Sequence, residues 1–171
     1  SLVGWLTVVA YAAAAVVCAV TARTWHASRD RRYLLFWWGL TALMLFLAVN
    51  KQLDLQSLLT QIGRRFVLAH GWQHAKRSIQ LTFIVGICLL ALVSFLGFLA
   101  LLRRRLGRHA LVLAGLAFLL GFILIRATSF HHVDRFIGWN PGGFRMNWVM
   151  ELGGIGLVAL GAWHARFREG S

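Results

Sequence analysis

Long apolar runs separated by short polar segments repeat along the whole chain. The runs are 16 to 22 residues long, and only the last contains a charged residue, a single acid. They cover 2–20, 33–49, 81–102, 110–125 and 148–163. A bilayer core about 30 Å thick needs roughly 17 to 25 helical residues to cross it. Because the runs are apolar throughout rather than alternating, they are not strands of a membrane barrel. The pattern therefore predicts five transmembrane helices.

A weaker helical pattern follows the second run, between 53 and 69. Its apolar side chains recur at helical spacing and occupy one side of the helix. They are Leu55, Leu58, Leu59, Ile62 and Phe66. A helix with one apolar and one polar side lies flat at the membrane surface. The predicted fold class is therefore all-α, a polytopic integral membrane bundle of five transmembrane helices plus one interfacial amphipathic helix. We expect a single domain over 1–171, because this length suits one compact unit.

The composition supports a membrane protein and argues against a nucleic-acid partner. Hydrophobic residues make up 59% of the chain, above the roughly 45–50% of soluble proteins. The net charge is +13, but the 18 Lys and Arg residues are concentrated at the ends of the predicted spans. There they face lipid headgroups instead of forming one basic face for DNA or RNA. We expect membrane lipids as partners, and no nucleic acid.

The basic residues also predict an orientation. Segments 21–32, 103–109 and 164–171 hold ten Lys and Arg in 27 residues, whereas 50–80 and 126–147 hold eight in 53. Cytoplasmic segments are the more basic, so we expect the N-terminus outside and the C-terminus in the cytoplasm. The expected location is a bacterial inner membrane. The first run lacks a basic start and an Ala-x-Ala cleavage site, so we expect a retained span rather than a signal peptide.

Acidic side chains at the predicted outer end are the candidates for catalysis. Glu151 lies about one turn inside the last span, where a charge is costly and usually functional. Asp54 lies just beyond the second span. Glu151 and Asp54 are therefore the predicted general acid or base. The alternative for Glu151 is a structural ion pair with Arg126, Arg145 or Lys51.

Two histidine clusters predict a metal site at the same end. His70 and His74 are four residues apart, so a helix would place them on one face. His131, His132 and Asp134 follow the fourth span and offer nitrogen and carboxylate ligands. These five residues are the candidate ligands for zinc or another divalent transition metal in a catalytic site with one open position. The alternative is that both clusters are solvated polar segments.

The run Ser129-Phe-His-His, with Asp134 and the His70/His74 pair, resembles the residue set of the membrane zinc hydrolases related to alkaline ceramidases. The resemblance covers few residues and implies a zinc-dependent hydrolase that acts in a membrane. Those enzymes have seven spans and hold the metal within them. Here the predicted spans number five, and the histidines lie at their ends.

Basic side chains near the predicted outer site are candidates for binding an acidic headgroup. They are Lys51, Arg64, Arg65 and Arg126. An arginine guanidinium matches the geometry of a phosphate. The alternative is ordinary anchoring of the helix ends at the membrane interface.

The predicted function is that of a metal-dependent membrane hydrolase, with a periplasmic site that acts on a lipid or lipid-linked substrate. Two alternatives stay open: a non-catalytic subunit that binds a partner membrane protein or a second copy, and a small proton-coupled transporter that uses Glu151. The chain has no Walker or dinucleotide glycine motif, which argues against an ATP-driven pump. No histidine lies deep in a predicted span, which argues against a b-type cytochrome.

Overall fold

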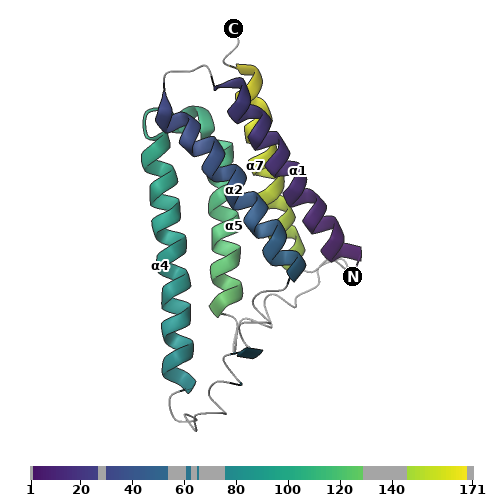
Figure 1. Ribbon diagram of the computed structural model, residues 1–171, viewed down its shortest axis with the longest axis vertical. Helices are drawn as coiled ribbons and strands as arrows, with labels where there is room; N and C mark the ends of the chain where they lie inside the picture. The colour runs from purple at the N-terminus through teal and green to yellow at the C-terminus, as the bar shows by residue number, and fades with distance from the viewer. Residues whose placement is uncertain are drawn as a thin grey trace.

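The protein is a bundle of long helices (Figure 1). The computed structural model describes residues 2–26, 30–53, 61–62, 65, 76–128 and 146–168. All regular secondary structure in these residues is helical. Consecutive long helices run in opposite directions, so the first begins and the last ends at opposite ends of the bundle. The predicted all-α class is confirmed.

Five long helices and one short 3-10 helix contain most of the described residues. They are α1 (Leu2–Thr24), α2 (Arg31–Leu53), α4 (Lys76–Leu102), η2 (Leu106–His109), α5 (Ala110–Thr128) and α7 (Met146–Arg168). Four segments of this part are long and apolar enough to cross a membrane. These candidate spans are Gly4–Thr24, Arg31–Leu53, Val85–Leu102 and Leu106–Ile125. The fold is thus compatible with a multi-pass membrane protein.

The helix α7 differs from these four in composition. Its 23 residues give a length of about 35 Å, enough for a bilayer core. Glu151 and four glycines lie within it, however, and it is not among the candidate spans. A fifth span is therefore not established by length and composition.

The helices extend beyond the predicted apolar runs. At the start of α2, Asp30 caps the helix, because its Oδ1 accepts the backbone N–H of Tyr33 at 3.4 Å. At the other end, α2 continues beyond position 49 to Leu53, since Lys and Gln are good helix formers. Lys51 is therefore a helical residue. Most of the predicted amphipathic segment, 53–69, lies outside the described residues.

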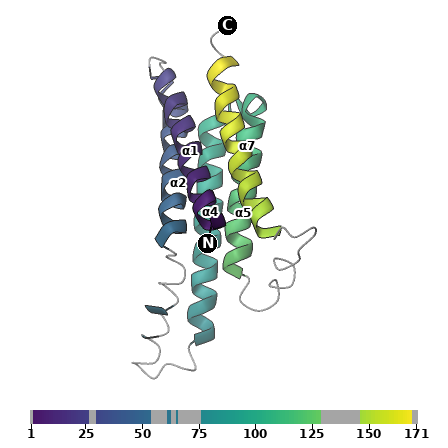
Figure 2. The same ribbon diagram turned by 90° about the vertical axis from the view of Figure 1, so that its right-hand side faces the viewer.

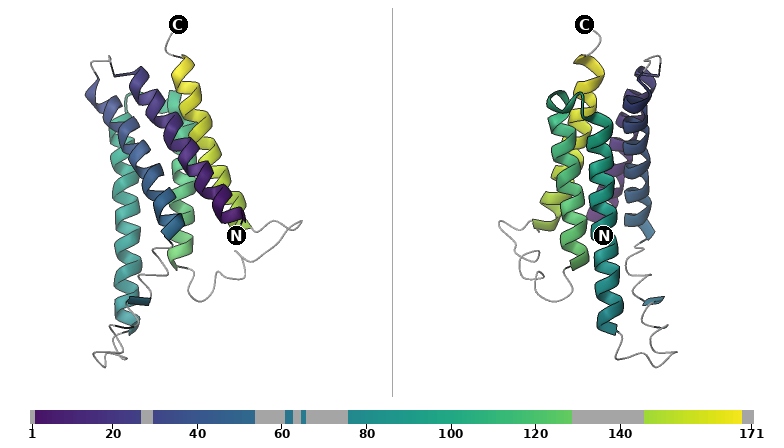
Figure 3. Two further views of the ribbon diagram at one scale, coloured as in Figure 1. Left: turned by 45° about the vertical axis from the view of Figure 1, so that its right-hand side comes forward. Right: turned by 90° about the vertical axis from the view of Figure 1, so that its left-hand side faces the viewer.

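The core forms where α1 packs on α2 and α7, and where α5 packs on α7 (Figure 2). Buried side chains of α2 recur three or four residues apart, as Tyr33, Trp37, Leu40 and Met44 do. Helix α4 lies along α2 and α5, and it extends beyond the other helices at the end where it begins (Figure 3). A buried Thr21 hydroxyl in α1 lies 3.1 Å from the Ala162 carbonyl oxygen in α7. This polar contact joins the first and last helices inside the apolar core.

Glycines set the distance between α5 and α7. A Cβ on Gly115 of α5 would lie 2.7 Å from the Val158 backbone nitrogen, and one on Gly154 would lie 2.9 Å from Leu119 Cγ. A Cβ on Gly161 would meet the backbone and side chain of Val112. Small residues allow close helix approach in membrane proteins. Two other glycines of α7, Gly153 and Gly156, face open space, so a run of four glycines in this helix contributes only two to the interface.

Candidate functional site

A buried carboxylate lies near the end of the bundle where α1 begins and α2 ends (Figure 1). It belongs to Glu151, in the second turn of α7, and the residue is only 2% exposed. An isolated charge at such a position would cost several kcal/mol of folding free energy. Side chains around Glu151 must therefore offset this free-energy cost.

Two other helices supply that compensation. Lys51, in the last turn of α2, places its Nζ 2.8 Å from Glu151 Oε2 and forms an ion pair. Tyr11, in the middle of α1, donates its hydroxyl to Glu151 Oε1 over 3.2 Å. Each carboxylate oxygen thus has its own donor. We call Tyr11, Lys51 and Glu151 the buried triad.

The buried triad joins an enclosed carboxylate to a more accessible amine. Side-chain exposure is 3% for Glu151 and 20% for Lys51. Tyr11 is buried. Lys51 is therefore the accessible member of the triad, whereas Glu151 and Tyr11 are enclosed. An amine and a phenol that contact a carboxylate form an arrangement that can relay or hold a proton.

The ion pair identifies which basic residue is the partner of Glu151. Arg126, Arg145 and Lys51 were the possible partners of Glu151, and the observed partner is Lys51. Arg126 lies in the last turns of α5, and its side chain is outside what the structure describes. Arg145 lies outside the described residues.

Most of the predicted catalytic, metal and substrate residues fall where the structure gives no description. They are Asp54, Arg64, His70, His74, His131, His132 and Asp134. Arg65 is described and exposed. Within the described ranges, no group of three or more His, Cys, Asp or Glu side chains is placed to hold a metal ion. The metal site thus stays a prediction.

Tyr11 is the member of the triad that the sequence analysis missed. It lies inside an apolar run, where an aromatic ring is expected to pack against other side chains. The chain has only two tyrosines, and a buried phenol usually requires a hydrogen-bond partner. That requirement was the signal available in the sequence, although it could not identify Glu151 as the partner.

The second tyrosine forms a polar cluster at the opposite end of the bundle. Tyr33 OH lies 2.8 Å from His109 Nε2, and His109 Nδ1 lies 3.1 Å from the Arg105 carbonyl oxygen. His109 is only 3% exposed. Trp25 and Trp37 pack edge-on against the Tyr33 ring. A buried polar cluster therefore lies near each end of the bundle.

Comparisons of this chain with protein-family models, with curated proteins and with solved structures find no match.

Proposed function

We propose that this chain is an integral protein of a bacterial inner membrane with five transmembrane helices, an outside N-terminus and a cytoplasmic C-terminus. Helix α7 would be the fifth span, since it has 23 residues and packs against α1 and α5. The pairing of Glu151 with Lys51 reduces the cost of bringing this acid into the bilayer. The segment 53–69 would lie on the outer surface as an amphipathic helix.

The proposed activity is metal-assisted hydrolysis of a lipid or lipid-linked substrate at the outer end. The observation that carries this proposal is the buried Glu151 carboxylate, with Lys51 Nζ at 2.8 Å and Tyr11 OH at 3.2 Å. Glu151 would act as general acid or base, because proton donors lie within hydrogen-bond reach of both its oxygens. Asp54, which directly follows α2 in the sequence, would be the second acid or base.

Metal and headgroup would be held by side chains around this triad. The proposed metal ligands are His70, His74, His131, His132 and Asp134. Zinc or another divalent transition metal would supply a Lewis acid for the hydrolysis. The acidic headgroup of the substrate would contact Lys51, Arg64, Arg65 and Arg126, as arginine and lysine commonly bind phosphate.

Metal content is the first test of the proposed hydrolase. Purified protein should contain zinc, iron or manganese at a near-stoichiometric level by elemental analysis. His70→Ala and His131→Ala should each lower that content. Metal-free wild-type protein that is folded and monodisperse would contradict the metal-assisted reaction.

Lipid turnover is the second test. Wild-type protein incubated with a total bacterial lipid extract should convert at least one lipid class, as followed by mass spectrometry. Glu151→Gln should reduce this conversion by about 100-fold or more, because it removes the proposed proton carrier. Gly156→Ala is the matched control in α7, since its Cβ would meet open space. Equal conversion by the wild type and Glu151→Gln would overturn the catalytic role.

The peripheral position of α4 favours a second candidate, a non-catalytic subunit that binds a partner membrane protein or a second copy. Only 11% of Val85–Leu102 is buried, against 39–44% of the other three candidate spans. Leu90 and Val93 are 69% and 65% exposed. Val93→Cys in a background without Cys18 and Cys88 should then form one cross-linked species of defined mass in native membranes. A helix that is covered only by lipid would leave the protein uncross-linked.

A further inference from the structure

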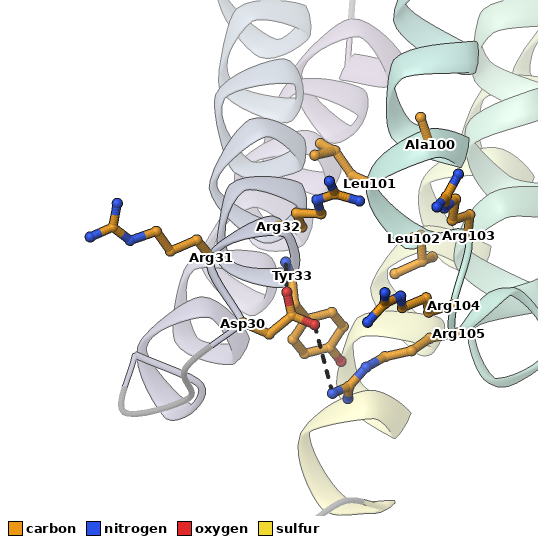
Figure 4. Close-up of a pocket in the computed structure, with 10 residues that line it drawn as sticks. All are labelled: Asp30, Arg31, Arg32, Tyr33, Ala100, Leu101, Leu102, Arg103, Arg104 and Arg105. Atoms are coloured by element: carbon orange, nitrogen blue, oxygen red, sulfur yellow. Dashed lines mark hydrogen bonds and ion pairs between the residues drawn. The ribbon is translucent and has the colours of Figure 1, made fainter.

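A pocket lies at the opposite end of the bundle from Glu151, between the start of α2 and the end of α4 (Figure 4). Its volume is about 560 Å³. One wall comes from the first turn of α2, and the other comes from the last turn of α4 and the turn that follows it. The pocket is separate from the buried triad and shares no residue with it.

The lining is strongly basic. It contains Arg31, Arg32, Arg103, Arg104 and Arg105, with Asp30 as the only acid. Five positive charges and one negative charge give the lining a formal net charge of +4. A concave surface of one sign concentrates ions of the opposite sign. The pocket is therefore suited to an anion.

Asp30 does not neutralise the four arginines other than Arg105. Its Oδ1 accepts the Tyr33 N–H, and its Oδ2 lies 4.0 Å from an Arg105 nitrogen. Among the residues that the structure describes, the remaining acid is Glu151, which pairs with Lys51 at the other end. The other arginines of the pocket thus have no acidic partner within the described ranges.

Two of these arginines extend into the space between the helices from opposite sides. Arg32 reaches in from α2 and Arg104 from the turn after α4, whereas Arg31 points away (Figure 4). The Arg105 guanidinium packs over the Tyr33 ring, with its carbon 4.6 Å from the ring centre. Tyr33 is itself held by His109. Arg105 is therefore held against buried side chains, whereas the other four arginines of the pocket are exposed.

The chemistry of the lining favours a phosphate group. A guanidinium binds phosphate through paired charge-assisted hydrogen bonds, and two guanidiniums on opposite walls can contact one phosphate from both sides. Ala100, Leu101 and Leu102 add apolar surface beside the arginines. We propose that this pocket binds the phosphate group of either an anionic phospholipid or a free phosphorylated compound. This proposal does not depend on the reaction proposed at the other end.

Calorimetric titration of the purified full-length protein in an uncharged detergent tests this binding. The probes are short-chain phosphatidic acid in the same detergent, glycerol 3-phosphate and inorganic phosphate. Wild-type protein should bind phosphatidic acid saturably. The double variant Arg32→Gln/Arg104→Gln should weaken the affinity about tenfold or more, because two charge-assisted contacts are lost.

The matched control is Arg23→Gln/Arg166→Gln, which removes the same charge at the same end of the bundle but outside the pocket. It should change the affinity by less than about threefold. Binding of phosphatidic acid alone identifies a lipid headgroup as the source, whereas binding of glycerol 3-phosphate or inorganic phosphate as well identifies a soluble compound. Equal losses in the two double variants, or no saturable binding of any probe by folded wild-type protein, would overturn the proposal.

Discussion

The free-energy cost of burying the Glu151 carboxylate depends on which side chains surround it. Glu151 is 2% exposed and has one donor from each of two other helices. An ion pair with a second hydrogen bond offsets much of the desolvation of the two charges. Removal of only one charge of this ion pair leaves the other charge buried without a counter-charge. This lowers stability more than removal of both charges does.

We therefore expect an ordered series of stabilities for variants of the triad. Lys51→Ala should lower the free energy of unfolding by about 3–5 kcal/mol, because Glu151 loses its counter-charge. Tyr11→Phe should cost about 1 kcal/mol, the value of one hydrogen bond. The double variant Lys51→Met/Glu151→Leu should recover most of the loss of Lys51→Ala, since it removes both charges. Reversible unfolding in detergent measures all three, and a double variant no more stable than Lys51→Ala would contradict the series.

At this scale the sequence predicted a role for Glu151 and included Lys51 among its possible partners. It could not choose between Lys51, Arg126 and Arg145, because that choice depends on how far α2 extends and how α7 rotates. Nor could it place His109, whose burial results from packing against Tyr33 and Trp37 on a different helix. Contacts between residues distant in sequence were the unpredictable part.

For the packing of α5 against α7, the position of each glycine matters more than the number of glycines. Gly154 and Gly161 face α5, whereas Gly153 and Gly156 face open space. The sequence does not show which of the four lies at an interface, because the composition of a run does not determine which side of the helix meets a neighbour. The rotation of α7 about its axis decides this.

Alanine substitutions should therefore have opposite effects on the two sides of α7. Gly161→Ala should lower the free energy of unfolding by about 1–3 kcal/mol, because its Cβ would lie 2.8 Å from the Val112 backbone nitrogen. Gly153→Ala should be neutral or stabilise the protein by up to about 1 kcal/mol through helix propensity. Unfolding of both variants in the same detergent provides the comparison. Equal losses would show that both sides of the helix are packed.

Over the whole molecule, the alternating direction of the helices gives the two ends different chemistry. The end with η2 holds the arginine-lined pocket, and the opposite end holds the buried triad. Hydropathy was sufficient to predict the all-α class and the four candidate spans, since each of these runs reflects the bilayer thickness. The pocket was not predicted, because it needs the start of α2 and the end of α4 to lie side by side.

The proposed orientation predicts which end a membrane-impermeant thiol reagent reaches. In a background that lacks Cys18 and Cys88, Gln52→Cys should react in intact cells whose outer membrane has been permeabilised. Arg108→Cys should react only after the inner membrane is also opened. Both native side chains are exposed in the structure, so burial does not protect either position. The reverse labelling pattern would place the arginine-lined pocket outside the cell.

The two tyrosines, Tyr11 and Tyr33, provide an experimental advantage. One contacts Glu151 and the other contacts His109, and the chain contains no further tyrosine. Replacement of either ring by phenylalanine leaves one tyrosine in a known environment, and isotope labelling of tyrosine then gives a nuclear magnetic resonance signal from that residue alone, despite the eight tryptophans. Each half of the bundle can therefore be monitored spectroscopically without attaching a dye.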